Sequence, residues 1–332
     1  MKKILITGAS GFIGSFLVEE ALTRNYEVYA GIRKTSSKVY LRDARINFLE
    51  LDFADRDALH KTISTAPHFD FVIHNAGITK ALKKEDFFVS NYSYTKLLVE
   101  ALLFHNNVPS KFIYMSSLAA YGPGNPVTQE AVKESDTPHP VTYYGSSKLQ
   151  SETYLSLLPN FPYLIIRPTA VYGPRDKDFL SLFKLIRNHL ELIVGSNKQQ
   201  LSFVYVKDLV SAVFLAMESQ ALNRAFFVSD GKSYKSDVFG NLLKEQLGKN
   251  TLRIKVPTLL AFLIASLSES TQYLSGIPAL LNRDKLNELK AVNWNCDTTP
   301  LVREFGFKPA YDLSSGIQET IFWYREAGWL KK

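Results

Sequence analysis

The first 22 residues, Met1 to Leu22, read MKKILITGASGFIGSFLVEEAL, a short apolar segment followed by a glycine-rich one. Two lysines before an apolar run also begin a secretory signal, whose apolar region continues for about 7 to 15 residues and ends in small residues at a cleavage site. Here three glycines interrupt the run and two glutamates follow it. We therefore expect this segment to be retained as a working part of the folded protein.

The same stretch has the pattern of a strand, a turn and a helix. Residues Lys2 to Ile6 are rich in isoleucine and leucine and bounded by a glycine, which is typical of a buried parallel strand. From Phe12 onward the apolar residues recur at helical spacing. Gly8, Gly11 and Gly14 form a G-x-x-G-x-x-G arrangement, whose first gap is one residue longer than in the common dinucleotide fingerprint.

Glycines at this place suit a diphosphate, which must approach bare backbone N–H groups at a helix N-terminus, where the helix dipole favours negative charge. A glycine-rich turn without a ligand would contain the same glycines. The interpretation as a dinucleotide-binding turn therefore rests on the preceding strand and the following helix. The turn is predicted to bind a dinucleotide through Gly8, Ser10, Gly11, Phe12, Ile13 and Gly14.

Length and composition limit the class of protein. A chain of 332 residues exceeds the usual size of one domain, so we expect two lobes. The hydrophobic fraction of 46% and the charged fraction of 21% are ordinary for a globular protein. A formal net charge of +7 favours anionic ligands. The sequence nevertheless has no block of lysines or arginines of the kind that binds a nucleic-acid backbone. We expect a small-molecule substrate and no nucleic acid.

Cysteine content and hydropathy bear on location. Cys296 is the only cysteine, so neither an intramolecular disulfide nor a cysteine-based metal cluster can form, and a cytoplasmic location is expected. The most apolar stretch, Val256 to Leu267, is shorter than the roughly 20 residues of a membrane span. We interpret it as a buried helix of the second lobe, with membrane docking as the alternative.

Further strand-like segments alternate with helical ones, which predicts an α/β fold with a Rossmann-like, doubly wound parallel sheet. The ligand site of such a fold lies at the carboxyl ends of the strands. The expected strands after the first are Tyr26 to Ile32, Ile46 to Asp52, Phe69 to Gly77, Lys111 to Ser117 and Tyr163 to Thr169.

The regularity weakens after Thr169, which indicates a smaller and mostly C-terminal substrate-binding lobe. We assign residues 1–168 to the dinucleotide-binding domain, and residues 169–200 and 231–332 to the substrate-binding lobe. Phe203 to Ala212 and Ala225 to Asp230 have strand character, so residues 201–230 are expected to return to the sheet.

Tyr144 and Lys148 stand four residues apart in the sequence YGSSK and hence on one face of a predicted helix. A tyrosine with a pKa near 10 is a poor base at neutral pH, and a nearby ammonium group favours the phenolate. The pair is therefore a candidate general acid/base unit. The same spacing also fits a solvated helix face.

The motifs TGASGFIG, SSLAAYG, YGSSK and RPTAVYGP follow one another in this order, and with them the chain resembles the extended short-chain dehydrogenase/reductase family, also called the NAD-dependent epimerase/dehydratase family. The resemblance covers most of the chain and is strongest up to about Asp208. It implies that Tyr144 transfers a proton, that Lys148 lowers the pKa of Tyr144 and binds the nicotinamide ribose, and that Ser117 orients the substrate. Ser116 is then a hydrogen-bonding residue at a strand end.

The resemblance also implies a role for Asn91, which matches the family asparagine at the start of the helix before the fifth strand. Tyr94 stands where glycine is usual, so the packing of that helix is expected to differ. Asp52 and Phe53 match adenine contacts of the family, although a helix cap and a core aromatic would explain them equally well. Asn75, Ala76 and Gly77 complete the predicted cofactor contacts.

The end of the second strand bears on the choice of cofactor. An acidic residue there would bind the ribose hydroxyls of NAD, but this chain has Ile32, Arg33 and Lys34. Arg33 favours NADP, with NAD as the alternative if Arg33 only stacks on adenine or faces solvent.

Residues beside Ser117 restrict the reaction within the family. Dehydratases carry an acid pair where this chain has Leu118 and Ala119, and decarboxylases carry a glutamate at the position of Ala119. We therefore predict an NAD(P)-dependent reductase/dehydrogenase acting on a secondary alcohol or its ketone. A nucleotide-sugar epimerase is the alternative, and a cofactor-sensing regulator without catalysis is a third reading, which the presence of the Ser-Tyr-Lys set opposes.

Two expectations concern contacts outside the reacting groups. The helices beginning near Asn91 and Tyr144 are those through which the family commonly forms dimers, so a homodimer is expected. Its candidate apolar surface is Leu97, Leu98, Ala101, Leu102, Leu149, Tyr154, Leu155 and Leu158, which core packing would also explain. Arg175 and Lys177 are placed either against a substrate phosphate or in a solvated loop.

Overall fold

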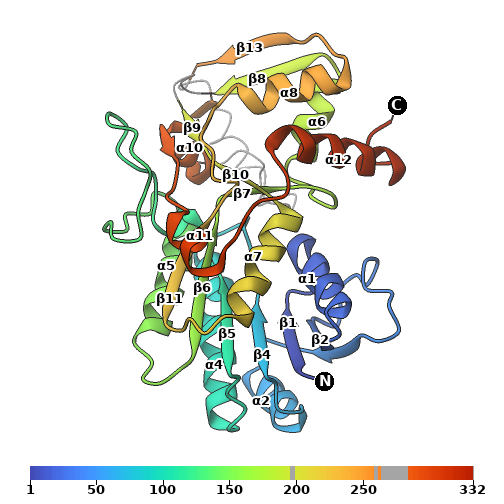
Figure 1. The fold of residues 1–332 in the computed structure, drawn as a ribbon, viewed down its shortest axis with the longest axis vertical. Coiled ribbons are helices and arrows are strands. Elements are labelled where there is room, and N and C mark those ends of the chain that lie inside the picture. The colour runs from blue at the N-terminus through green and yellow to red at the C-terminus, as the bar shows by residue number, and fades with distance from the viewer. Residues whose placement is uncertain (195–198, 258–260, 263–282, 332) are drawn as a thin grey trace.

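A computed structural model describes residues 1–194, 199–257, 261–262 and 283–331 of the chain. Its centre is a seven-stranded sheet in which every pair of neighbours is parallel (Figure 1). The strands lie in the order β11-β6-β5-β4-β1-β2-β3. Their bounds are β1 Lys3–Thr7, β2 Glu27–Ile32, β3 Asn47–Glu50, β4 Phe71–His74, β5 Lys111–Met115, β6 Tyr163–Pro168 and β11 Arg224–Val228.

Helices cover both faces of this sheet because its strands alternate apolar side chains toward each face. Ile4 and Ile6 of β1 belong to a core with α1 (Phe12–Thr23), α7 (Val206–Glu218) and α11 (Thr299–Phe305). Leu5, between them, belongs to the core on the opposite face. That face is covered by α2 (Arg56–Thr65), α4 (Tyr94–Phe104) and α5 (Tyr143–Ser156).

The strand order reverses between β1 and β4, since β2 and β3 lie on one side of β1 while β4, β5 and β6 continue on the other. In open parallel sheets, ligands bind outside the carboxyl ends of the strands at such a switch point. The loops after β1 and β4 therefore flank the expected cofactor site.

The six strands predicted between residues 2 and 169 are confirmed, with ends that differ by a few residues. The strand predicted over 225–230 is also confirmed, because β11 adds to the sheet beside β6. The prediction over 203–212 is wrong beyond Tyr205. Only β10 (Phe203–Tyr205) is a strand there, and it pairs with β7 (Ala170–Tyr172) outside the large sheet.

The error over 203–212 has a physical cause. Three β-branched valines in this stretch favour a strand locally. Yet Val206, Leu209, Val210 and Val213 recur at helical spacing, and all four are buried in α7 against the sheet. Burial along one face of a helix outweighs local propensity here.

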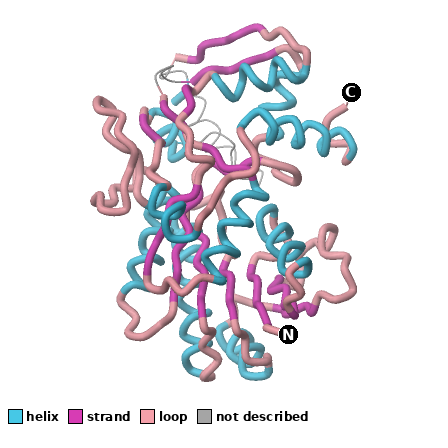
Figure 2. Tube along the Cα trace, in the orientation of Figure 1, coloured by secondary structure: helices cyan, strands magenta, loops and turns pink. Residues whose placement is uncertain are grey.

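A second group of elements forms an outer lobe, drawn as the upper part of Figure 2. Its core contains Tyr172, Phe183, Phe239 and Tyr324. The remaining elements are α3 Lys84–Phe87, η1 Phe88–Ser93 and η2 Leu118–Ala120, which adjoin the large sheet, and α6 Leu180–Arg187, β8 Leu190–Val194, β9 Gln200–Leu201, β12 Tyr234–Lys235, α8 Val238–Leu247, β13 Leu252–Val256, α10 Arg283–Lys290, β14 Asn293–Trp294 and α12 Leu313–Glu326.

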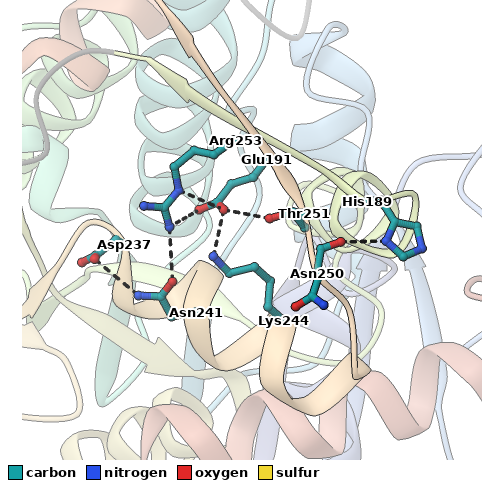
Figure 3. A network of polar contacts seen from close by, with 8 residues as sticks. All are labelled: His189, Glu191, Asp237, Asn241, Lys244, Asn250, Thr251 and Arg253. Carbon is teal, nitrogen blue, oxygen red and sulfur yellow. Dashed lines mark hydrogen bonds and ion pairs between the residues drawn. The ribbon is translucent and has the colours of Figure 1, made fainter.

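One carboxylate joins three elements of the outer lobe (Figure 3). The buried Glu191 of β8 accepts hydrogen bonds from Lys244 Nζ of α8 at 2.8 Å, from Thr251 Oγ1 at 3.1 Å and from Arg253 Nε of β13 at 3.2 Å. Two cations hold the pKa of this carboxyl below its usual range against the effect of burial, which raises the pKa. The network therefore fixes α8 against the paired strands β8 and β13.

The division into lobes is interleaved along the chain. Leu301 of α11 and Phe307 lie close to the C-terminus but are buried in the same core as α1 and α7. The boundaries at residues 168, 200 and 230 stay a prediction.

Part of the sequence predictions falls outside the described residues. The apolar stretch from Val256 to Leu267, interpreted as a buried helix, lies largely in residues 258–260 and 263–282, which the structure does not describe. Among the described residues, none of the helices combines the length and the hydropathy that crossing a bilayer requires.

The proposed dimer surface is partly used inside the chain itself. Leu98, Ala101, Leu102 and Leu155 are buried in the core beneath α4 and α5, so these four side chains cannot face a partner. The homodimer itself stays a prediction.

Candidate functional site

The glycine-rich turn between β1 and α1 packs directly on the end of β4. Gly8 has a φ of +64°, and a Cβ there would lie 2.9 Å from backbone atoms of Asn75 and Ala76. A Cβ on Gly14 would lie 2.1 Å from the carbonyl oxygen of Gly8. Only glycine fits both positions, because backbone atoms cannot move aside as a flexible side chain could.

The turn leaves the N-terminus of α1 without a side-chain cap. Gly11 is its N-cap residue and supplies no side-chain hydrogen bond, while Ser10, Phe12 and Ile13 are only partly buried. Uncapped N–H groups and the positive end of the helix dipole favour an anion at this point. These residues fit the diphosphate of a dinucleotide.

We expect Gly14→Ala to destabilise the protein by about 1–3 kcal/mol, because the added methyl group overlaps the backbone of Gly8. Urea unfolding measures the change in the free energy of unfolding. Gly240→Ala is the matched control, since Gly240 also lies in a helix but a Cβ there meets nothing nearer than 3.4 Å. Equal stability of the two variants would contradict the claim that a methyl group at position 14 overlaps the backbone of Gly8.

The structure brings Ser117, Tyr144 and Lys148 together at the carboxyl end of β5. Ser117 follows β5 by two residues and lies close enough to Tyr144 for their hydroxyl groups to interact. Tyr144 is the second residue of α5 and is partly buried. Lys148 is buried one turn later, and its Nζ donates to the carbonyl oxygen of Met115 at 2.7 Å.

Burial shifts the pKa of both titratable groups toward their neutral forms. It raises the pKa of Tyr144 to about 12, with the Ser117 hydroxyl opposing the shift and Glu288 adding to it. Burial also lowers the pKa of Lys148 to about 8, against the attraction of Glu152. At neutral pH the tyrosine is therefore a phenol that can donate a proton, and the lysine is mostly an ammonium.

Asn91, Gly77 and Lys148 lie next to one another. A Cβ on Gly77 would lie 2.7 Å from Asn91 Oδ1 and 3.3 Å from Lys148 Nζ, so glycine at this exposed position lets the backbone lie close to both groups. The Asn91 amide is oriented by Ile78 N–H, which donates to Oδ1 at 2.8 Å, and by Ser147 Oγ, which accepts from Nδ2 at 2.9 Å.

The prediction that Asn91 stands at the start of its helix is wrong. The helical segment begins earlier, with α3 at Lys84, and continues through η1 into α4. Asn91 lies inside η1, a wider turn that places its side chain toward α5. The tyrosine at position 94 stacks on Phe53 with ring centroids 5.4 Å apart, which gives a contact that glycine could not make.

The basic residue predicted to select the cofactor lies where expected, at the end of β2. Arg33 is exposed, and its backbone N–H donates to Ser36 Oγ at 3.1 Å. Asp52 is exposed and accepts from Ala54 N–H at 3.0 Å, while Asp55 caps α2. Asp52 is thus not the helix cap that its sequence position also allowed.

Two buried partners of the site were missed from the sequence. Glu152, one turn after Lys148, accepts a hydrogen bond from Ser116 Oγ. It also forms an ion pair with Arg167 at 2.7 Å. The guanidinium of Arg167 lies 4.1 Å from the ring centre of Tyr121. The spacing of four residues between Lys148 and Glu152 was a signal that they share a helix face.

A buried histidine was also missed. His74 Nδ1 lies 2.8 Å from Thr7 Oγ1, and its Nε2 lies 3.0 Å from Thr95 Oγ1. Burial lowers the pKa of His74 to about 3, so the ring is neutral and links the end of β1 to α4. The sequence contained no signal for this role, because a single histidine at the end of a strand looks like any other core residue.

Arg175 does not lie in a solvated loop, one of its two predicted environments, and its contact with a substrate phosphate stays a prediction. Its side chain is 13% exposed and donates to Ser15 Oγ at 2.9 Å and to the Glu19 carboxylate at 2.6 Å. Lys177 is exposed, with Nζ 6.0 Å from the ring centre of Trp329. The described residues contain no group of three or more His, Cys, Asp or Glu side chains arranged to hold a metal ion.

The strand order 3-2-1-4-5-6, extended by β11, together with the glycine-rich turn, defines a dinucleotide-binding fold of the Rossmann type. Residues 4–228 match the model of the NAD dependent epimerase/dehydratase family. The chain belongs to this family, the extended short-chain dehydrogenases/reductases, and its relatives are named as enzymes.

Three comparisons illustrate the range of the family. The chain is 26% identical to ceramide reductase of Caulobacter vibrioides over 99% of this chain and 96% of the relative. It is 26% identical to sterol-4-alpha-carboxylate 3-dehydrogenase, decarboxylating, of Dictyostelium discoideum, over 96% of this chain and 100% of the relative. The solved UDP-glucose 4-epimerase of Thermus thermophilus in complex with NAD has a TM-score of 0.78 at 22% identity, over 98% of this chain and 99% of that one.

Proposed function

We propose that this protein is an NAD(P)-dependent oxidoreductase that interconverts a ketone and a secondary alcohol. The observation that carries the proposal is the placement of Tyr144 beside Ser117, with Lys148 one turn along α5 and next to Gly77. This set lies at the carboxyl end of β5, on the side of the strand switch point opposite β2 and Arg33. A dinucleotide lying across the switch point would reach both.

When bound, the nicotinamide supplies or accepts the hydride at the substrate carbon. In the direction of reduction, Tyr144 donates its phenolic proton to the carbonyl oxygen, and Ser117 holds that oxygen by a hydrogen bond. Lys148, whose Nζ lies beside Gly77, would bind the nicotinamide ribose. The expectation that Lys148 lowers the pKa of Tyr144 is not met, because its Nζ donates to the carbonyl oxygen of Met115 and the pKa of Tyr144 is raised by burial. The backbone at Gly77 and the uncapped turn of α1 hold the dinucleotide.

Activity with a panel of ketones, followed by the loss of NADPH absorbance, tests the reaction type. A ketone that is reduced with one NADPH consumed per alcohol formed supports the proposal. Nucleotide-sugar interconversion without net change in the nicotinamide would replace it with the epimerase.

NADP is the proposed cofactor, because Arg33 stands at the end of β2 where an acid would bind the ribose of NAD. We expect Arg33→Ser to weaken NADPH binding about 10- to 100-fold, as expected for the loss of a hydrogen-bonded ionic contact to the 2′-phosphate. Isothermal titration calorimetry measures it. NADH, which lacks that phosphate, is the matched control and should bind both proteins alike. An equal loss for both nucleotides would contradict a 2′-phosphate contact.

A nucleotide-sugar epimerase is the second candidate, favoured by the similarity of the whole chain to the UDP-glucose 4-epimerase fold. An epimerase must keep its nicotinamide between the two hydride transfers. Tightly held NAD in the purified protein, together with a preference for NADH over NADPH, would support this candidate over the reductase.

A further inference from the structure

One short segment connects the outer lobe to both sides of the predicted cofactor groove. We call residues 173–179, GPRDKDF, the bridging segment. It follows β7 and precedes α6. Arg175 binds Ser15 and Glu19 of α1, and Ser15 directly follows Gly14 of the phosphate-binding turn.

The opposite wall of the groove is reached by the same segment. Asp178 pairs with Lys80 Nζ at 2.5 Å. Lys80 stands three residues after Gly77, on the loop that follows β4. The bridging segment is therefore bonded to α1, the helix that follows the phosphate-binding turn, and to the loop after β4, on the two sides of the strand switch point.

Arg175 also reaches a third part of the cofactor region. Its guanidinium lies 4.3 Å from the ring centre of Phe16 and 4.5 Å from that of Tyr40. Tyr40 belongs to the loop after β2, which begins with Arg33. Arg175 adopts a φ of +72°, which is uncommon for a residue with a Cβ and persists only where surrounding contacts hold it.

The bridging segment is also bonded to the outer lobe. The buried Tyr324 of α12 donates its hydroxyl to the backbone carbonyl of Asp176 at 2.6 Å. The Asp176 carboxylate accepts the N–H groups of Asp178 at 2.8 Å and Phe179 at 3.0 Å. A movement of α12 or α6 would therefore be transmitted to Arg175 and Asp178.

We propose that Arg175 and Asp178 are positioning residues of the cofactor site, and that together they clamp α1 and the loop after β4, which flank the dinucleotide. The clamp rests on the proposed function, because it needs a nucleotide in that groove. With both ion pairs closed, α1 and the loop after β4 keep a fixed separation and the nucleotide is retained. Release requires at least one pair to open.

The first test is the rate of NADPH release, measured by stopped-flow displacement with the wild type, Arg175→Met and Glu19→Ala. We expect release about 10-fold faster in both variants, the effect of losing about one charge-assisted contact. The sign for Glu19→Ala is decisive. Removing a negative charge near an anionic ligand would by electrostatics alone slow its release, whereas an opened clamp speeds it.

Lys177→Met is the matched control, since it removes one positive charge from the same segment, where Lys177 is exposed. Its release rate should stay within about twofold of the wild type at an ionic strength of about 0.15 M, where screening weakens exposed charges. Lys80→Met tests the second ion pair independently of α1, and it should also speed release.

The outcomes separate the clamp from the function beneath it. Wild-type protein that binds NADPH while Arg175→Met, Glu19→Ala and Lys80→Met all release it at the wild-type rate would overturn the clamp alone. A lower melting temperature in these variants with an unchanged release rate would also overturn it, because that is the signature of a purely structural contact. Wild-type protein that binds neither NADPH nor NADH would overturn the proposed function and the clamp with it.

Discussion

Tyr144→Phe is expected to lower turnover by about 10²- to 10⁴-fold, the range for removing a positioned general acid. The substitution deletes only the hydroxyl group that lies beside Ser117 and leaves the ring in place. Nucleotide affinity should therefore stay within about twofold of the wild type, because the phenolic proton matters for the chemical step and not for holding the diphosphate. Steady-state rates with a ketone substrate and calorimetric titration with NADPH measure the two effects.

Tyr143→Phe is the control for this experiment. Tyr143 is the neighbouring residue on α5, its side chain is exposed, and the same atom is removed. Its turnover should match the wild type. If Tyr144→Phe kept full activity, the proton-transfer role of Tyr144 would be wrong, and the phenol would be only a structural neighbour of Ser117.

Arg167→Met should destabilise the protein by about 3–5 kcal/mol, because it leaves the Glu152 carboxylate buried without its cation. Both side chains are almost fully buried, at 7% and 4% exposure, and three hydrogen bonds join them. The free energy of unfolding from urea titration gives the size of the loss. Glu152 also favours the charged form of Lys148. We therefore expect Arg167→Met to lower activity as well, but by less than Tyr144→Phe does.

Arg224→Met provides the comparison at the protein surface. Arg224 pairs with Glu304 at the same 2.7 Å, but the two side chains are 44% and 37% exposed. Its loss should cost no more than about 1 kcal/mol, since solvent screens the pair and hydrates the remaining carboxylate. Similar losses for the two arginine variants would show that burial does not set the strength of the inner pair.

The sheet could be predicted from the sequence because its strands are short, apolar and separated by helical segments, as β1 and α1 illustrate. Such patterns are local, so each element can be recognised without knowing its neighbours. The pairing of Tyr144 with Lys148 also followed from local spacing, whereas the choice of Ser117 as their partner came from the resemblance to the family.

The parts that could not be predicted depend on contacts between distant residues. Arg175 meets Ser15 across 160 positions of the chain, and no periodicity marks that pairing. Glu152 and Arg167 form an ion pair because a helix and a strand pack together, although either residue alone looks like a surface charge. The first part of α7, Val206 to Ala212, was mistaken for a strand because its burial is set by the sheet beneath it.

The return of α11 to the sheet affects how the protein folds. Leu301 and Phe307 come after the outer-lobe segments in the sequence, yet they belong to a core whose first members lie in β1 and α1. We therefore expect the dinucleotide-binding part and the outer lobe to unfold in one cooperative transition, because a loss of α11 would leave that core incomplete.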